Sequence, residues 1–144
     1  MTQPQLEANK RIVRDYFDAG NRGDFDSQLA YFDDDNFKLI CRARPPLGYS
    51  IDKPRLAQMM KDVDNVLKGP LQVTIDLLTA EDDRVAVQAH SRGERVQGGL
   101  YENNYHFLFT IRNNKIIQIE EYLCSYTMSK DMEEEVWQDA GYIN

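Results

Sequence analysis

The chain has 144 residues, of which 42% are hydrophobic and 28% charged, with a formal net charge of -7. This length predicts a single domain over residues 1–144 that can form a core without disulfides. The acidic balance disfavours nucleic acid, and no apolar run is long enough for a membrane span or a signal peptide. The two cysteines show neither zinc-site spacing nor a disulfide framework. We therefore expect a cytoplasmic protein with reduced cysteines.

Helices are predicted in the first third of the chain. Within the first twenty residues, apolar side chains recur at three- and four-residue steps on one face. Pro4 suits the first turn of this helix, and two glycines and an asparagine over residues 20–23 favour its end. Asp24 is a suitable N-cap for a short second helix that runs through Phe32.

The middle of the chain contains one strand signal and one helix signal. Residues 37–42 are predicted to form the first strand, and residues 44–48 a loop, because their Pro-Pro pair supports neither helix nor strand pairing. A third helix is expected after Asp52. Its apolar stripe extends to Leu67, and the Gly-Pro pair at residues 69–70 ends it.

The second half of the chain is predicted to be mostly sheet. Apolar residues alternate at period two from Leu71 to Leu77, and further strands are expected over the ranges 84–92, 100–112 and 115–125. Two asparagines at 113–114 favour a tight hairpin turn, because asparagine tolerates positive φ. A last helix is expected over about residues 129–140. This order predicts an α+β fold with about five strands and helices over one face of an antiparallel sheet.

Three stretches carry a family resemblance. They are YFDAGNRGDF at residues 16–25 followed by YFDDD at 31–35, YENNYHFLF at 101–109, and NKII at 114–117 ending in EEYL at 120–123. In order and spacing the chain resembles the SnoaL-like and ketosteroid-isomerase-like branch of the nuclear transport factor 2-like superfamily. The resemblance implies a cone-shaped, cystatin-like α+β barrel with a curved sheet wrapped around the N-terminal helices. It also implies an apolar pocket between sheet and helices, and a homodimer through the open sheet face.

The resemblance also suggests roles for individual positions. In ketosteroid isomerases a tyrosine of the first helix donates to the substrate oxygen, and Tyr16 matches it. The position of that family's base falls near Ile40, and that of its second oxygen-binding acid falls near Phe107, so ketosteroid isomerisation is not expected. SnoaL-like relatives often carry an aspartate shortly after the final Glu-Tyr pair, where this chain has Cys124.

Five residues of the long strand share one face, because side chains alternate along a strand. They are Tyr101, Asn103, Tyr105, Phe107 and Phe109. The resemblance turns this face toward the pocket. Asn103 either satisfies a structural hydrogen bond or orients a substrate oxygen. Tyr105 is either a core tyrosine bonded to the backbone or part of the pocket wall.

Glu121 is the candidate for proton transfer. In the last strand it shares a face with Ile117, Ile119 and Leu123, so it is expected to point inward. Burial would raise its pKa and suit it to act as a general acid or base. The alternatives are a salt bridge to an arginine, or a register that differs by one residue.

Other polar and aromatic residues have weaker claims to a functional role. His90 and His106 are expected on the outer face of the sheet. Arg42 and Arg44, beside the Pro-Pro loop, either form a pocket rim or pair with nearby acids. Trp137 either closes the pocket mouth or packs in the core.

Two kinds of function fit these features. The first is an enzyme without metal or organic cofactor that isomerises, dehydrates or cyclises a small, mostly apolar carbonyl or hydroxyl compound. Glu121 would move the proton, and Tyr16 with Tyr105 or Asn103 would hold the oxygen. Residues expected to contact the substrate are Phe107, Phe109, Ile40 and Trp137. The second is a module that binds a ligand without chemistry, or that uses its sheet face for assembly.

Overall fold

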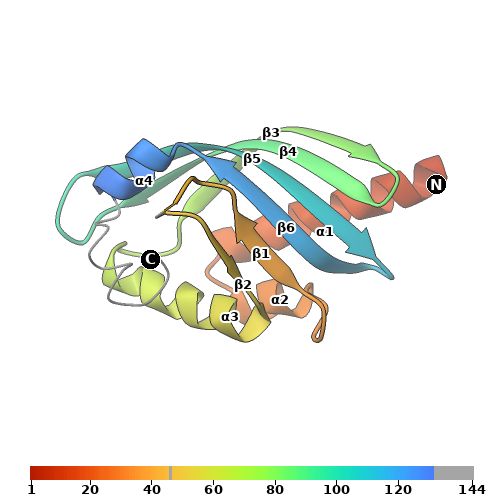
Figure 1. The fold of residues 1–144 in the computed structure, drawn as a ribbon, viewed down its shortest axis with the longest axis horizontal. Helices are drawn as coiled ribbons and strands as arrows, with labels where there is room; N and C mark the ends of the chain where they lie inside the picture. The colour runs from red at the N-terminus through yellow and green to blue at the C-terminus, as the bar shows by residue number, and fades with distance from the viewer. Residues whose placement is uncertain (46, 132–144) are drawn as a thin grey trace.

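The computed structural model describes residues 1–45 and 47–131 (Figure 1). Its helices are α1 (Gln3–Asn21), α2 (Phe25–Ala30), α3 (Lys53–Asp62) and α4 (Ser125–Asp131). Its strands are β1 (Lys38–Cys41), β2 (Tyr49–Ile51), β3 (Gln72–Glu81), β4 (Arg84–Glu94), β5 (Leu100–Arg112) and β6 (Lys115–Leu123). The predicted order of elements is present through β6, with β2 as an addition. Most of the last predicted helix, over about residues 129–140, lies outside the described residues.

The six strands form one curved, unclosed sheet in the order β2-β1-β6-β5-β4-β3 (Figure 1). All neighbours are antiparallel except β1 and β6, which run parallel. Helix α1 packs against β3 and β4, and α3 contacts β1 and α2. The predicted α+β class is confirmed. The expected strand number was too low because β2 has three residues, too few for a period-two signal.

Local sequence accounts for where the helices begin and end. The hydroxyl of Thr2 and the side chain of Gln5 form a capping box at the start of α1. As predicted, Asp24 caps α2, and its carboxylate accepts a hydrogen bond from the Ser27 amide at 3.2 Å. Helix α3 is shorter than predicted, because residues 63–65 form a 3-10 turn and Leu67 pairs with a residue beyond β4.

Two register shifts reverse the predicted facing of residues in β3 and β6. The first lies between Ile75 and Leu77, and it leaves Leu77 54% exposed where the alternation predicted an inward side chain. The second lies where β6 meets the end of β5, and it buries Ile116 completely in place of the predicted Ile117. The asparagine turn at residues 113–114 has positive φ at both positions, as predicted.

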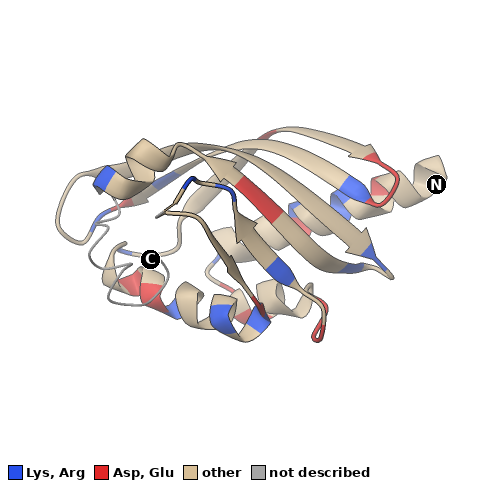
Figure 2. Ribbon diagram, in the orientation of Figure 1, with Lys and Arg blue, Asp and Glu red and all other residues tan. Residues whose placement is uncertain are grey.

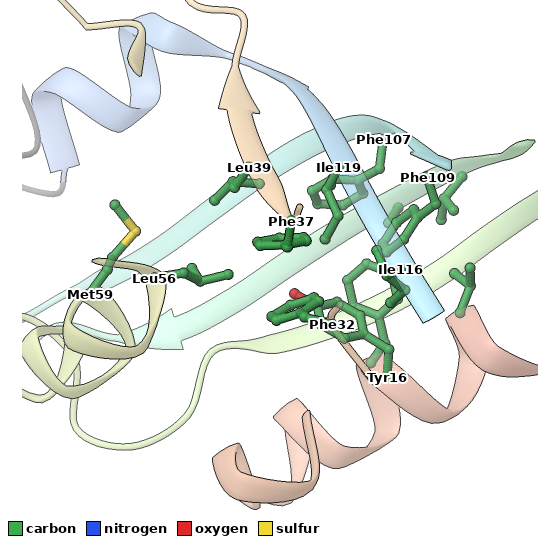
Figure 3. Packing of buried hydrophobic residues seen from close by; sticks show 14 of the residues in the cluster. Tyr16, Phe32, Phe37, Leu39, Leu56, Met59, Phe107, Phe109, Ile116 and Ile119 are labelled. Atoms are coloured by element: carbon green, nitrogen blue, oxygen red, sulfur yellow. The ribbon is translucent and has the colours of Figure 1, made fainter. Parts of the chain in front are cut away.

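The core fills the space between α1 and the concave face of the sheet (Figure 3). Phe32 stacks on Phe37 with ring centroids 3.9 Å apart. Tyr16 enters from α1 and meets Phe109 edge-on at 5.6 Å. Because aromatic rings from α1, from β5 and from the segment between α2 and β1 converge here, the core holds α1 in a fixed position against the sheet.

Asn21 attaches the end of α1 to the edge strand β3. Its Nδ2 donates to the Val73 carbonyl at 2.8 Å, and its Oδ1 accepts from the Val73 amide at 2.8 Å. These bonds satisfy backbone groups that an edge strand would otherwise leave unpaired. We expect Asn21→Ala to lower the free energy of unfolding by about 1–2 kcal/mol, measured by urea denaturation.

Two further variants test this tether. Asn21→Asp keeps the acceptor but loses the donor, so its loss of stability should be intermediate. Asn65→Ala removes an exposed asparagine that has no described side-chain hydrogen bond, and it should have little effect. Equal losses from Asn21→Ala and Asn65→Ala would contradict the tether.

Charged residues lie at turns, on helices and along the strands (Figure 2), and the exposed positions of β4 mark the outer face of the sheet. On that face the His90 ring lies 2.9 Å from an Asp76 carboxylate oxygen, and His106 is exposed, as the alternation predicted. The homodimer expected through this face stays a prediction. Within the described ranges, no helix is long and apolar enough to span a membrane.

Candidate functional site

A cavity of about 230 Å³ lies between the helices and the concave face of the sheet. Its volume equals that of roughly seven or eight liquid waters. Its lining is Tyr16, Phe17, Gly20, Asn21, Phe25, Gln28, Leu39, Tyr49, Leu56, Met59, Met60, Val63, Leu71, Val73, Tyr105, Phe107, Phe109, Ile119, Glu121 and Met128. This lining, which is drawn from the described residues, contains one carboxylate and no Lys, Arg or His.

Glu121 supplies that carboxylate from β6. Its neighbours across the sheet are Phe107 of β5 and Cys41 of β1. Burial among these groups raises the pKa of the Glu121 carboxyl from 4.5 to about 7. Among the described residues, no arginine pairs with its side chain, whereas the adjacent Glu120 pairs with Arg42 at 2.9 Å. The carboxyl can therefore both release and take up a proton near neutral pH.

Tyr16 reaches the same cavity from α1 and is 8% exposed. Burial, and then the nearby charge of Glu121, raise the pKa of its phenol well above the ordinary value. The phenol therefore stays protonated at any physiological pH. Its hydroxyl makes no hydrogen bond to the described residues, so it is available as a donor toward the cavity.

Tyr105 also lines the cavity, but its hydroxyl already has a partner. It lies 2.9 Å from the Ser91 hydroxyl, and its ring stacks on Phe107 with centroids 5.0 Å apart. Burial raises the pKa of Tyr105 well above its usual value, and the charge of Tyr101 adds to this shift. Tyr105 is thus a neutral wall residue whose hydroxyl is oriented by Ser91.

Asn103 lies outside the cavity lining and has structural partners. Its Nδ2 donates to the Tyr101 hydroxyl at 2.7 Å and to the Cys124 carbonyl at 3.2 Å. Its Oδ1 accepts from the Cys124 amide at 3.1 Å. These bonds fasten the start of β5 to the end of β6, which is the structural alternative considered for this residue.

The other candidate residues have three different outcomes. Phe107 and Phe109 line the cavity together with Tyr16, Tyr105 and Glu121. Ile40 does not, because alternation along β1 turns its neighbours inward: Leu39 lines the cavity and Cys41 is buried. Trp137 lies outside the described residues.

Gln28 is a lining residue that the sequence analysis missed. It is 8% exposed on α2, one of few polar side chains buried to this extent. Its position three residues after Phe25 and four before Phe32 places it on the apolar stripe of α2. A glutamine on such a stripe was the signal that could have identified it.

Cys41 is a buried thiol beside Glu121. Burial, and then the charge of Glu121, raise its pKa to about 12, so it stays protonated. Across the described ranges, no group of three or more His, Cys, Asp or Glu side chains is arranged to hold a metal ion.

Comparison with known proteins establishes the family. The model of the SnoaL-like domain matches residues 13–119, so the chain belongs to the SnoaL-like domain family, as its motifs predicted. No curated protein matches the sequence significantly.

Solved structures share the fold at low sequence identity. An NTF2-like protein from Burkholderia xenovorans has a TM-score of 0.70 and 22% identity, over 89% of this chain and 98% of that one. TerC, co-crystallised with polyporic acid, has a TM-score of 0.75 and 15% identity, over 88% and 99%. An LEH-like epoxide hydrolase from M. tuberculosis has a TM-score of 0.74 and 16% identity, over 96% and 99%. At these identities the likeness concerns the fold alone.

Proposed function

We propose that this protein is an acid/base enzyme that transfers a proton on a small, neutral, mostly apolar carbonyl or hydroxyl compound, in a reaction of the isomerase, dehydratase or cyclase type. One observation carries the proposal. Glu121 is a carboxyl without an ion-pair partner among the described residues, and it lines an apolar cavity with its pKa raised to about 7. A structural carboxylate would normally be paired or exposed.

The chemistry needs two groups of the chain. The Glu121 carboxylate takes a proton from the carbon next to a carbonyl, and the electrons of that C–H bond form the C=C bond of an enolate. The negative charge moves to the carbonyl oxygen, where the neutral Tyr16 phenol donates a hydrogen bond. Glu121 then returns the proton to the same or another carbon. Tyr16 and Glu121 line the same cavity, and the charge of Glu121 contributes to the raised pKa of the Tyr16 phenol, which supports this pairing.

Neighbours of the same fold lend the proposal some support. TerC was co-crystallised with polyporic acid, and the M. tuberculosis relative is an LEH-like epoxide hydrolase. Small-molecule sites therefore occur in proteins of this shape, although each chemistry belongs to its own protein.

Proton exchange tests the proposal without knowledge of the natural substrate. Small neutral ketones are incubated with the protein in deuterated water, and loss of the α-proton signal is followed by NMR. We expect protein-dependent exchange whose rate rises with pH and levels off above about 7, because the deprotonated form of Glu121 is the base.

Two variants make the result specific. Glu121→Gln should abolish the exchange, whereas Glu120→Gln, which changes the neighbouring carboxylate paired with Arg42, should retain it. Saturable ketone binding without exchange would instead favour a ligand-binding module. Exchange that survives in Glu121→Gln would refute the role of this carboxyl.

A further inference from the structure

The amide of Gln28 is a buried polar group without a hydrogen-bond partner among the described residues. It makes no hydrogen bond to the described residues, although the residue is 8% exposed. Within the described ranges, no completely enclosed side-chain nitrogen or oxygen is left without a partner. The amide of Gln28 must therefore open onto space, and the residue lines the cavity that also contains Glu121.

Gly20 makes room for this amide. A Cβ atom at Gly20 would overlap the Nε2 and carbonyl carbon of the Gln28 side chain. Gly20 also lines the cavity, and it lies one helical turn after Tyr16 on α1. The four-residue step from Tyr16 to Gly20 corresponds to about 6 Å along the helix axis. The Gln28 amide thus lies beside α1 at a point about one turn further along the helix than the backbone of Tyr16.

The rest of the lining limits what could bind this amide. A carboxylate or phosphate would meet no cation in the described lining, and it would be repelled by ionised Glu121. A purely apolar ligand would cover the amide and leave it without a partner. The complement is a neutral hydroxyl, carbonyl or carboxamide.

We propose that Gln28 is a specificity-determining residue that selects neutral ligands with two polar groups at opposite ends of an apolar body. One end reaches Glu121 and Tyr16, and the other hydrogen-bonds to the Gln28 amide. The inference rests on the proposed function for the identity of the first end. It adds a second polar group to the substrate class.

A matched pair of probes tests this selection. The first is 4′-(hydroxymethyl)acetophenone and the second is 4′-ethylacetophenone, which has the same shape but lacks the second polar group. Dissociation constants are measured by NMR titration. In Gln28→Met, we expect the preference for the hydroxymethyl compound over the ethyl compound to fall by about fivefold. The reason is that one net hydrogen bond to the ligand is lost. Gln88→Met makes the same change on the exposed outer face and should leave the ratio unchanged.

Gly20→Ala provides an independent route if methionine at position 28 disturbs the fold. It displaces the amide without removing it, and only the end of a flexible side chain has to move. We expect the same shift in ratio with no loss of melting temperature. An unchanged ratio in Gln28→Met, or no binding of either probe by the wild-type chain, overturns the proposal.

The proposed function and this inference can fail separately. A shifted binding ratio without ketone exchange would leave the Gln28 contact standing and remove proton transfer by Glu121. Ketone exchange with an unshifted binding ratio would leave proton transfer by Glu121 standing and remove the Gln28 contact.

Discussion

At pH 8, Glu121→Gln is expected to raise the free energy of unfolding by about 2–3 kcal/mol relative to the wild-type chain. The reason is the cost of holding an ionised carboxyl in an apolar cavity, which glutamine avoids. Burial raises the pKa of Glu121 from 4.5 to about 7 in the folded chain. The unfolded chain therefore loses this proton at lower pH than the folded chain does.

The sign of the pH dependence follows from this order. Below about pH 4.5 the carboxyl is protonated in both states, so ionisation costs the folded state nothing. Between 4.5 and 7 the unfolded state ionises first, and the cost grows with pH. Above about 7 the cost is fully present and constant. The advantage of Glu121→Gln should thus be largest at pH 8 and shrink steadily toward pH 4.5.

Urea denaturation at pH 8, 6.5 and 5 measures this difference. Glu120→Gln is the control, because its carboxylate is bonded to Arg42 rather than placed in the cavity. Removing that ion pair should give no gain at pH 8. If Glu121→Gln were no more stable than the wild-type chain at pH 8, the carboxyl would not be desolvated, and Glu121 would lack the raised pKa that proton transfer near neutral pH requires.

A gain in stability together with a loss of proton exchange would have a clear meaning. Substitutions that stabilise a protein while abolishing its activity mark positions where the chain keeps an unfavourable group for function. With both results, Glu121 would be such a position. A purely structural carboxyl would show the opposite pattern, because its removal would destabilise the fold.

Much of the fold could be predicted from the sequence, because local patterns determine it. The caps and glycines that bound α1 and α2, and the asparagine turn before β6, act within a few residues of chain. The bulges of β3 and β6 could not be predicted, since each is set by the neighbouring strand. They moved Leu77 outward and Ile116 inward.

The site was harder to predict because it depends on which side chains share one cavity. Glu121 was identified because it stands on an otherwise apolar strand face. Ile40 was placed by family resemblance, yet alternation along β1 turns Leu39 to the cavity instead. Gln28 was overlooked, although its place between Phe25 and Phe32 on the apolar stripe of α2 was a usable signal, because the pattern does not show that the stripe faces a cavity at this point.

Phe109→Ala is expected to lower the free energy of unfolding by about 3–5 kcal/mol. Phe109 is completely buried, and its ring centroid lies 5.7 Å from that of Phe17 and 5.6 Å from that of Tyr16. Its loss removes apolar burial and leaves a space that the surrounding rings of α1 and β5 can fill only in part. Since single domains have about 5–15 kcal/mol of stability, this change could remove half of it.

Graded variants separate the contribution of packing from that of hydrophobicity. Phe109→Leu keeps an apolar side chain and should lose less than alanine, whereas Leu77→Ala at an exposed position should change stability by less than about 0.5 kcal/mol. Phe109 also lines the cavity beside Tyr16, so the alanine variant enlarges the site as it weakens the core. If the free energy of unfolding fell by less than 1 kcal/mol, α1 would be able to move toward the sheet and fill the space left by the ring. The cavity wall would then be deformable, and the placement of the Tyr16 phenol would not depend on this ring.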